Sequence, residues 1–167
     1  FAALYPVLRA LEERGQVRRG YFIRGLGGAQ FALPGAVDRL RACREPDPDD
    51  LEPLVLSAVD PAQPYGATLP WPDSVGRPAR TAGAHVVLVA GDPVAFVERG
   101  GRTLFTFPAV AQHPHWVQGL AALVKDGRVR RLEIMRVDGE QASASWLAGQ
   151  LLEVGFAPSH RGLVLRG

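Results

Sequence analysis

The feature that most constrains the fold is the order of patterns in the first forty residues, where a helical stretch precedes two short strand-like stretches. Apolar residues recur three and four positions apart, as on one face of a helix, at Leu4, Val7, Leu8 and Leu11. This spacing predicts an amphipathic helix. Gly15 follows directly, and glycine is the residue that most often ends a helix.

Two strands joined by a glycine-rich turn are predicted after this helix. Residues 17–23 and 29–33 are rich in β-branched and aromatic side chains, and residues 24–28 form the turn. A helix followed by such a hairpin is the order at the end of a winged helix, where the hairpin is the wing. We therefore predict the C-terminal part of a winged helix over residues 1–45. Because Phe1 already stands within the helical pattern, we expect the chain to be a piece of a longer protein.

A proline-rich acidic segment follows this region. Residues 46–53 hold three prolines and four acidic residues, a composition that neither a helix nor a central strand tolerates. We predict a linker there and a second unit over residues 54–167.

The net charge of +2 is distributed unevenly along the chain. Residues 1–45 hold eight bases and four acids, residues 46–76 hold six acids and no base, and residues 77–167 hold eleven bases and seven acids. The two basic ends are where a polyanion could bind, although a solvated surface of mixed charge explains the same counts.

The second unit shows a clear β pattern followed by helices. Three strands separated by glycine-containing turns are predicted at 84–90, 94–99 and 102–107. Four residues mark the buried face of a following helix: Trp116, Leu120, Leu123 and Val124. A strand over 129–137, a helix capped by Ser143 and a last strand over 163–165 complete the pattern. The predicted fold class is α+β, with the C-terminal part of a winged helix followed by a β-barrel-like meander with two packed helices.

A long proline-rich loop and the absence of several catalytic motifs limit the reactions that this chain could catalyse. Residues 62–82 are predicted as a loop that is either functional or held on the core by Tyr65 and Trp71. The sequence holds no phosphate-binding loop, no nucleophile elbow and no paired cysteines. His113 and His115 could ligate a metal only with a third partner, so we expect no metal and no cofactor in this segment. No apolar run of about eighteen residues occurs, which predicts a cytoplasmic protein without a membrane span.

Arginines dominate the candidate binding residues. On the predicted helix and wing, the candidate DNA contacts are Arg9, Arg14, Arg18, Arg19 and Arg24, because guanidinium groups bind phosphate oxygens. Tyr21 either stacks on an unpaired base or packs against its own helix. Arg128 and Arg130 form a second basic cluster on one face of a strand. Asp60 is the candidate for a catalytic or ligand-holding carboxylate, and its alternative role is to accept hydrogen bonds in a turn.

Three stretches carry a resemblance to a known family. They are the run from Phe1 to Glu12, the wing from Val17 to Ala32, and the segment Asp60-Pro61-Ala62-Gln63-Pro64-Tyr65-Gly66 followed by Leu69-Pro70-Trp71-Pro72. Together with residues 157–166, they resemble the C-terminal region of the bacterial large helicase-related (Lhr) proteins. The resemblance implies a parent that is an ATP-dependent 3′–5′ DNA repair helicase of superfamily 2, with ATP and Mg²⁺ bound in motor domains outside this chain and a location in the bacterial nucleoid.

The resemblance implies three alternative roles. The first is a DNA-binding accessory module that contacts single-stranded or tailed DNA, or an RNA:DNA hybrid, beside the rest of the helicase chain. The second is a uracil-removing DNA glycosylase, although the Gln-x-Gln pair of related glycosylases is absent, since Gln30 is followed by Phe31 and Ala32. The third is a module through which helicase chains form a homo-oligomer. Whether this segment is itself an enzyme is left open.

Overall fold

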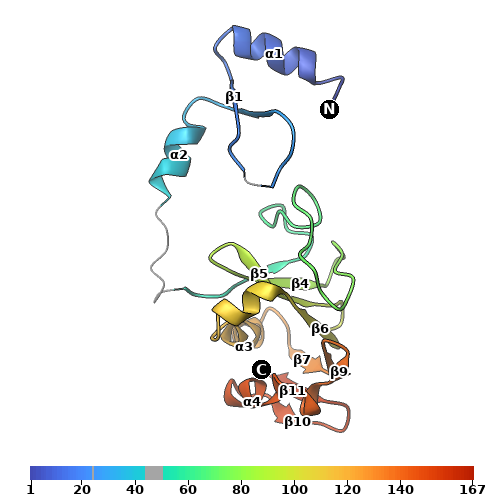
Figure 1. Ribbon diagram of the computed structural model, residues 1–167. Coiled ribbons are helices and arrows are strands. Elements are labelled where there is room, and N and C mark those ends of the chain that lie inside the picture. Colours follow the sequence, from blue (N-terminus) through green and yellow to red (C-terminus); the bar gives the residue numbers. More distant parts are fainter. Residues whose placement is uncertain (24, 44–50) are drawn as a thin grey trace. The chain divides into compact units, whose positions relative to one another are not determined.

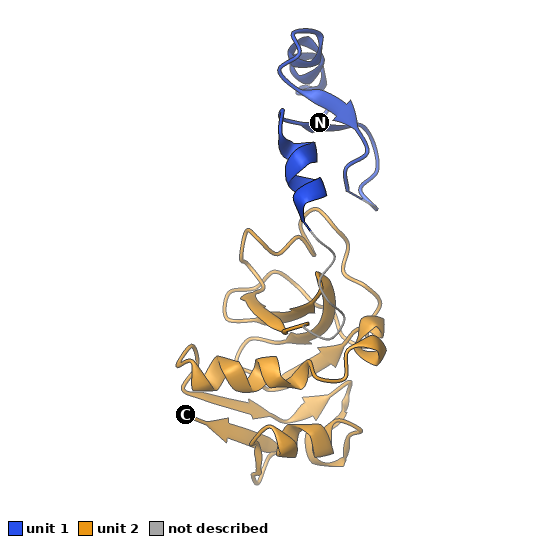
Figure 2. Ribbon diagram, turned by 90° about the vertical axis from the view of Figure 1, so that its left-hand side faces the viewer, with its two compact units in different colours: residues 1–46 blue, residues 47–167 orange. Residues whose placement is uncertain are grey.

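The computed structural model describes residues 1–23, 25–43 and 51–167, and the chain divides into two compact units, Phe1–Pro46 and Asp47–Gly167 (Figures 1 and 2). Arg24 and most of the predicted linker over residues 46–53 lie outside the described residues.

The first unit contains the predicted helix and hairpin. Helix α1 spans Tyr5–Glu13, strands β1 (Arg18–Gly20) and β2 (Gln30–Ala32) pair antiparallel, and helix α2 spans Ala36–Ala42. The strands are shorter than predicted. Beyond β1, the amides of Phe22 and Ile23 donate to the side chain of Gln30 and not to the backbone of a partner strand.

The predicted stop of α1 at Gly15 is confirmed. Gly15 has φ +70°. Its amide donates to the carbonyl of Glu12, and the amide of Gln16 donates to the carbonyl of Leu11. This pair of hydrogen bonds closes the free carbonyls of the last turn, and glycine adopts the required left-handed backbone without strain.

The second unit contains two sheets. The larger has the order β3 (Leu54–Ser57), β4 (His85–Val89), β5 (Asp92–Val97), β6 (Thr103–Thr106), β8 (Arg136–Val137) and β9 (Glu140–Gln141). The smaller has the order β10 (Ala157–Pro158), β11 (Leu163–Arg166) and β7 (Arg131–Ile134). Strands β4, β5 and β6 confirm the predicted meander. Mixed α/β architecture is therefore established, but the barrel-like closure is not confirmed, since within the described residues the larger sheet ends at β3 and β9.

Helices cover one face of the larger sheet. Helix α3 (Val117–Lys125) begins beside the buried Trp116 and buries the predicted residues Leu120, Leu123 and Val124. The short helix α4 (Ala148–Glu153) lies nearer the smaller sheet (Figure 1) and buries Leu151. Two 3₁₀ turns, Pro108–Gln112 and Ala142–Ala144, join these elements to the strands. The core on this face joins both sheets to both helices.

Two local predictions are wrong. The strand expected over 129–137 is two strands in different sheets, because the carbonyl of Arg102 accepts the amides of both Met135 (2.8 Å) and Arg136 (3.1 Å) and redirects the chain. Ser143 does not cap a helix. It lies exposed in a 3₁₀ turn, and α4 begins five residues later, where the carbonyl of Ser145 accepts the amide of Ala148.

The long loop covers the opposite face of the larger sheet. The Trp71 ring stacks on Phe107 at 6.0 Å and meets Phe96 edge-on at 5.4 Å, and Tyr65 stacks on Trp71 at 6.0 Å. Gly66 lies so close to the indole that a β-carbon there would overlap it. Of the two alternatives for this loop, the structure therefore supports anchoring by its aromatic residues. None of the helices in the described residues is long and apolar enough to cross a membrane.

Candidate nucleic-acid interface

The wing loop is held by one buried side chain, that of Gln30. Its Oε1 accepts the amides of Phe22 (2.7 Å) and Ile23 (2.8 Å), and its Nε2 donates to the carbonyls of Ile23 (3.0 Å) and Leu26 (2.7 Å). The side chain is only 8% exposed. All four hydrogen-bonding positions of the amide bind backbone, so the start of the loop has a fixed shape although it forms no strand.

Tyr21 lies at the start of this fixed loop and points into solvent. Its side chain is 89% exposed, so it does not pack against its own helix. An exposed aromatic ring on a fixed backbone is a stacking surface for an unpaired base.

The arginines of β1 lie on opposite faces, because strand side chains alternate. Arg19 faces α1, where its Nη1 donates to the Tyr5 hydroxyl (3.3 Å) and its Nε lies 3.4 Å from a Glu12 carboxylate oxygen. Arg18 is exposed on the other face and makes no ion pair within the part of the chain that the structure describes. Of the two, Arg18 is the one whose guanidinium is available to a ligand.

The predicted candidates on α1 also differ in their partners. Arg9 pairs with Glu13 at 3.1 Å, both largely exposed, and such a surface pair is easily exchanged for another partner. Arg14 is exposed at the end of the helix. Arg24 lies outside the described residues, so its predicted role rests on the sequence alone.

The second predicted cluster is divided by the fold. Arg128 donates to the carbonyl of Val55 in β3 at 2.7 Å, which ties the end of α3 to the sheet. Arg130 is exposed just before β7. The structure therefore gives Arg128 a structural contact and leaves Arg130 in solvent.

Asp60 takes part in a turn. Its Oδ1 accepts the amide of Ala62 at 2.8 Å, which is the hydrogen-bonding alternative to a catalytic role. The neighbouring carbonyls of Val59, Asp60 and Gln63 all accept from the guanidinium of Arg80, at 3.2, 3.1 and 2.6 Å. The stretch from Asp60 to Gly66 is thus an anchored start of the long loop. The catalytic hypothesis for Asp60 stays a prediction.

Two basic clefts in the second unit were not predicted. One, of about 270 Å³, is lined by Arg77, Thr81, Glu98 and Arg99, and the other, of about 210 Å³, by Met135, Arg136, Gln141 and Arg161. Their arginines are far apart in the sequence and follow no motif, so only the net positive charge of residues 77–167 pointed to them.

Two other candidate sites have fewer features of a binding site. His113 and His115 border a small cleft with Trp116, but within residues 1–23, 25–43 and 51–167 no group of three metal-ligating side chains occurs. The first unit has an apolar cleft of about 640 Å³ beside the wing, lined by residues such as Phe22, Leu26 and Phe31.

His85 gives the second unit a pH dependence that can be measured. Burial, and secondarily the charge of Arg128, lower the pKa of His85 below its ordinary 6.5. Since the unfolded chain then binds a proton more readily than the folded one, the free energy of unfolding is highest above pH 6.5 and falls as the pH drops below it. We expect His85→Gln to flatten this fall between pH 7.5 and 5.5 in urea titrations. An unchanged pH dependence in the variant would contradict the assignment.

Known proteins are similar to this chain over nearly its whole length. Residues 1–52 match the family model described as large helicase-related protein, winged-helix domain. Over 99% of its length the chain is 43% identical to the "Lhr helicase/ probable uracil glycosylase" of Mycolicibacterium smegmatis, and over 98% it is 31% identical to the "Lhr helicase/uracil glycosylase" of Escherichia coli. The chain spans only 12% and 11% of the length of these relatives. The chain therefore belongs to the Lhr helicase family.

Proposed function

We propose that this chain is a DNA-binding accessory module of an ATP-dependent 3′–5′ DNA repair helicase, and that the exposed wing side chains of Arg18 and Tyr21 contact the nucleic acid. The motor domains that use ATP and Mg²⁺ would lie elsewhere in the helicase. The observation that carries the proposal is the exposure of Tyr21 and Arg18 on a hairpin fixed by Gln30.

The chemistry of these two side chains is complementary. The Arg18 guanidinium binds phosphate oxygens and displaces condensed counterions, which gives affinity without sequence specificity. The Tyr21 ring stacks on a base that is not paired, which favours single-stranded or tailed DNA, or the unpaired part of an RNA:DNA hybrid. Because Gln30 already orders the start of the loop, binding of nucleic acid by Arg18 and Tyr21 carries less of the entropic cost of ordering it.

Substitution of both residues tests the proposal. We expect Arg18→Ala/Tyr21→Ala to weaken binding of fluorescent single-stranded DNA by about tenfold or more, because one stacked base contributes about 1–3 kcal/mol. The slope of log K against log salt should also fall by about 0.7 for the lost phosphate contact. Fluorescence anisotropy at two salt concentrations measures both.

Arg41→Ala is the matched control, because Arg41 is an exposed arginine of α2 that lies 3.7 Å from Asp38. It should change affinity less than threefold, as expected for a remote surface charge (~0.5 kcal/mol). If the wing variant binds with the affinity and salt slope of the control, the proposal is wrong.

Uracil removal and assembly into a homo-oligomer are the alternatives that the family suggests. Uracil glycosylase stands in the names of both relatives, and hydrolytic base removal needs a carboxylate that activates water. The turn hydrogen bond of Asp60 does not favour that role, so DNA binding by the wing is the function that the described geometry supports best.

A further inference from the structure

The arginines of the second unit fall into two groups according to what their guanidinium groups bind. Arg80 and Arg128 donate to backbone carbonyls, and Arg131 pairs with Glu133 at 2.8 Å. Arg136 donates to the carbonyl of Gly139 through one nitrogen, Nη1. Among the described residues of this unit, exposed arginine side chains without an ion pair or a hydrogen bond are those of Arg77, Arg99, Arg102, Arg130, Arg161 and Arg166. The first group stabilises the fold, whereas the second has guanidinium groups left for a ligand.

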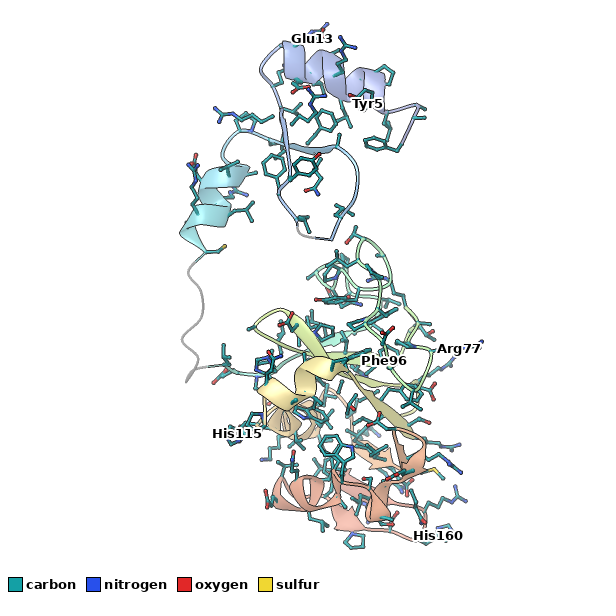
Figure 3. All side chains as sticks on the ribbon, in the orientation of Figure 1. Tyr5, Glu13, Arg77, Phe96, His115 and His160 are labelled. Carbon is teal, nitrogen blue, oxygen red and sulfur yellow. The ribbon has the colours of Figure 1, made fainter. Side chains whose placement is uncertain are left out.

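Three of these free arginines line the two clefts. Arg77 and Arg99 lie at the cleft of about 270 Å³, together with the hydroxyl-bearing Thr81, the half-buried Glu98 and the buried ring of Phe96. Figure 3 labels Arg77, whose side chain extends outward from the loop, away from the ribbon. With one carboxylate against two guanidinium groups, this cleft has a net positive charge.

The second cleft has a stronger positive charge. Arg136 and Arg161 line it with the neutral side chains of Met135 and Gln141. The guanidinium of Arg136 is oriented by a hydrogen bond to the carbonyl of Gly139 at 2.9 Å. The nearby carboxylate of Glu133 accepts from Ser159 at 3.0 Å and pairs with Arg131, which offsets its negative charge.

The backbone connects the two clefts through Arg102. Arg99 and Arg102 flank the turn between β5 and β6, and the carbonyl of Arg102 accepts the amides of Met135 and Arg136 in the wall of the second cleft. Arg99, Arg102 and Arg136 therefore follow one another across neighbouring segments of the unit.

We propose that these two clefts and Arg102 form a track for the phosphodiester backbone of single-stranded nucleic acid. Two separate clefts of about 270 and 210 Å³, each with two arginines, suit a chain of regularly spaced phosphates better than one free anion. The two guanidinium groups at each cleft do not suit a purely apolar partner. The track rests on the proposed function and adds a second nucleic-acid contact to it. None of its residues lies in the wing.

The test uses the full chain and three cleft arginines that make no hydrogen bond or ion pair among the described residues. We expect Arg77→Ala/Arg99→Ala/Arg161→Ala to weaken binding of fluorescent oligothymidine at least tenfold and to lower its salt slope by about 2, since single strands give about 0.7 per phosphate contact. The control Arg41→Ala/Lys125→Ala/Arg166→Ala removes the same charge at exposed positions outside the two clefts and should change binding less than threefold. Equal losses in the two triple variants would overturn the track.

A second measurement uses only the wild-type chain, so its result does not depend on whether the variants fold. Phenylglyoxal modifies accessible arginines of the wild-type chain, and mass spectrometry reports which ones react. Bound oligothymidine should protect Arg77, Arg99 and Arg161 while the exposed Arg166 stays reactive. Protection of Arg166 without protection of the cleft residues would overturn the inference. Loss of binding only in the wing variant would refute the track alone, whereas loss only in the cleft variant would refute the wing proposal alone.

Discussion

Trp116→Ala should lower the free energy of unfolding of the second unit by about 3–5 kcal/mol, the usual cost of truncating a fully buried aromatic residue. Trp116 is 1% exposed and is the largest fully buried side chain among the described residues. It stands at the start of α3, in the core that joins the helices to both sheets. Its loss leaves a cavity that the surrounding side chains fill only in part. Urea titration followed by circular dichroism measures the change.

Trp146→Ala provides a matched control for this substitution. Trp146 undergoes the same chemical change but is 53% exposed, so we expect less than about 1 kcal/mol of destabilisation. If both variants lose the same stability, Trp116 does not occupy the buried position described above.

Trp71→Ala should destabilise the second unit by about 3 kcal/mol, because the ring joins three aromatic contacts that each add about 0.5–1.5 kcal/mol to its burial. The indole stacks on Phe107 and Tyr65 and meets Phe96 edge-on. Without it, the loop loses its main anchor over that face of the larger sheet. We expect limited proteolysis to cut residues 62–82 faster than in the wild type, together with a lower urea midpoint.

Val75→Ala is the control within the same loop, because Val75 is 72% exposed. It should leave both the proteolysis rate and the urea midpoint close to wild type. Unchanged proteolysis in Trp71→Ala would show that the loop is held by other contacts, such as the three hydrogen bonds of Arg80.

Elements with a local signal were predictable from the sequence. The apolar spacing in α1, the turn at Gly15 and the strand-forming runs with glycine turns in β4 to β6 depend on near neighbours, and the structure contains each of them. The error over 129–137 arose where a distant backbone group competes with a local preference, whereas the helix expected after Ser143 begins five residues later, beside Ser145. At Met135 the distant group is the carbonyl of Arg102, more than thirty residues away.

The candidate site was predictable in composition but not in geometry. Alternation along β1 separates Arg18 from Arg19, but only the packing of α1 places Tyr5 and Glu12 beside Arg19. Arg128 and Arg130 look equivalent in the sequence. The fold distinguishes them, because the strand that binds Arg128 is seventy-three residues away in the chain.

The sequence by itself determined the first helix and hairpin, the β4 to β6 meander, the turn glycines and an abundance of arginine, because these depend on residues a few positions apart or on composition. Only the tertiary structure decided which arginines are available to a ligand, since a guanidinium satisfied by a distant carbonyl or carboxylate is occupied and one that lines an open cleft is not. The contrast between Arg80, which binds three carbonyls, and Arg77 in its cleft, three positions away, has that physical cause.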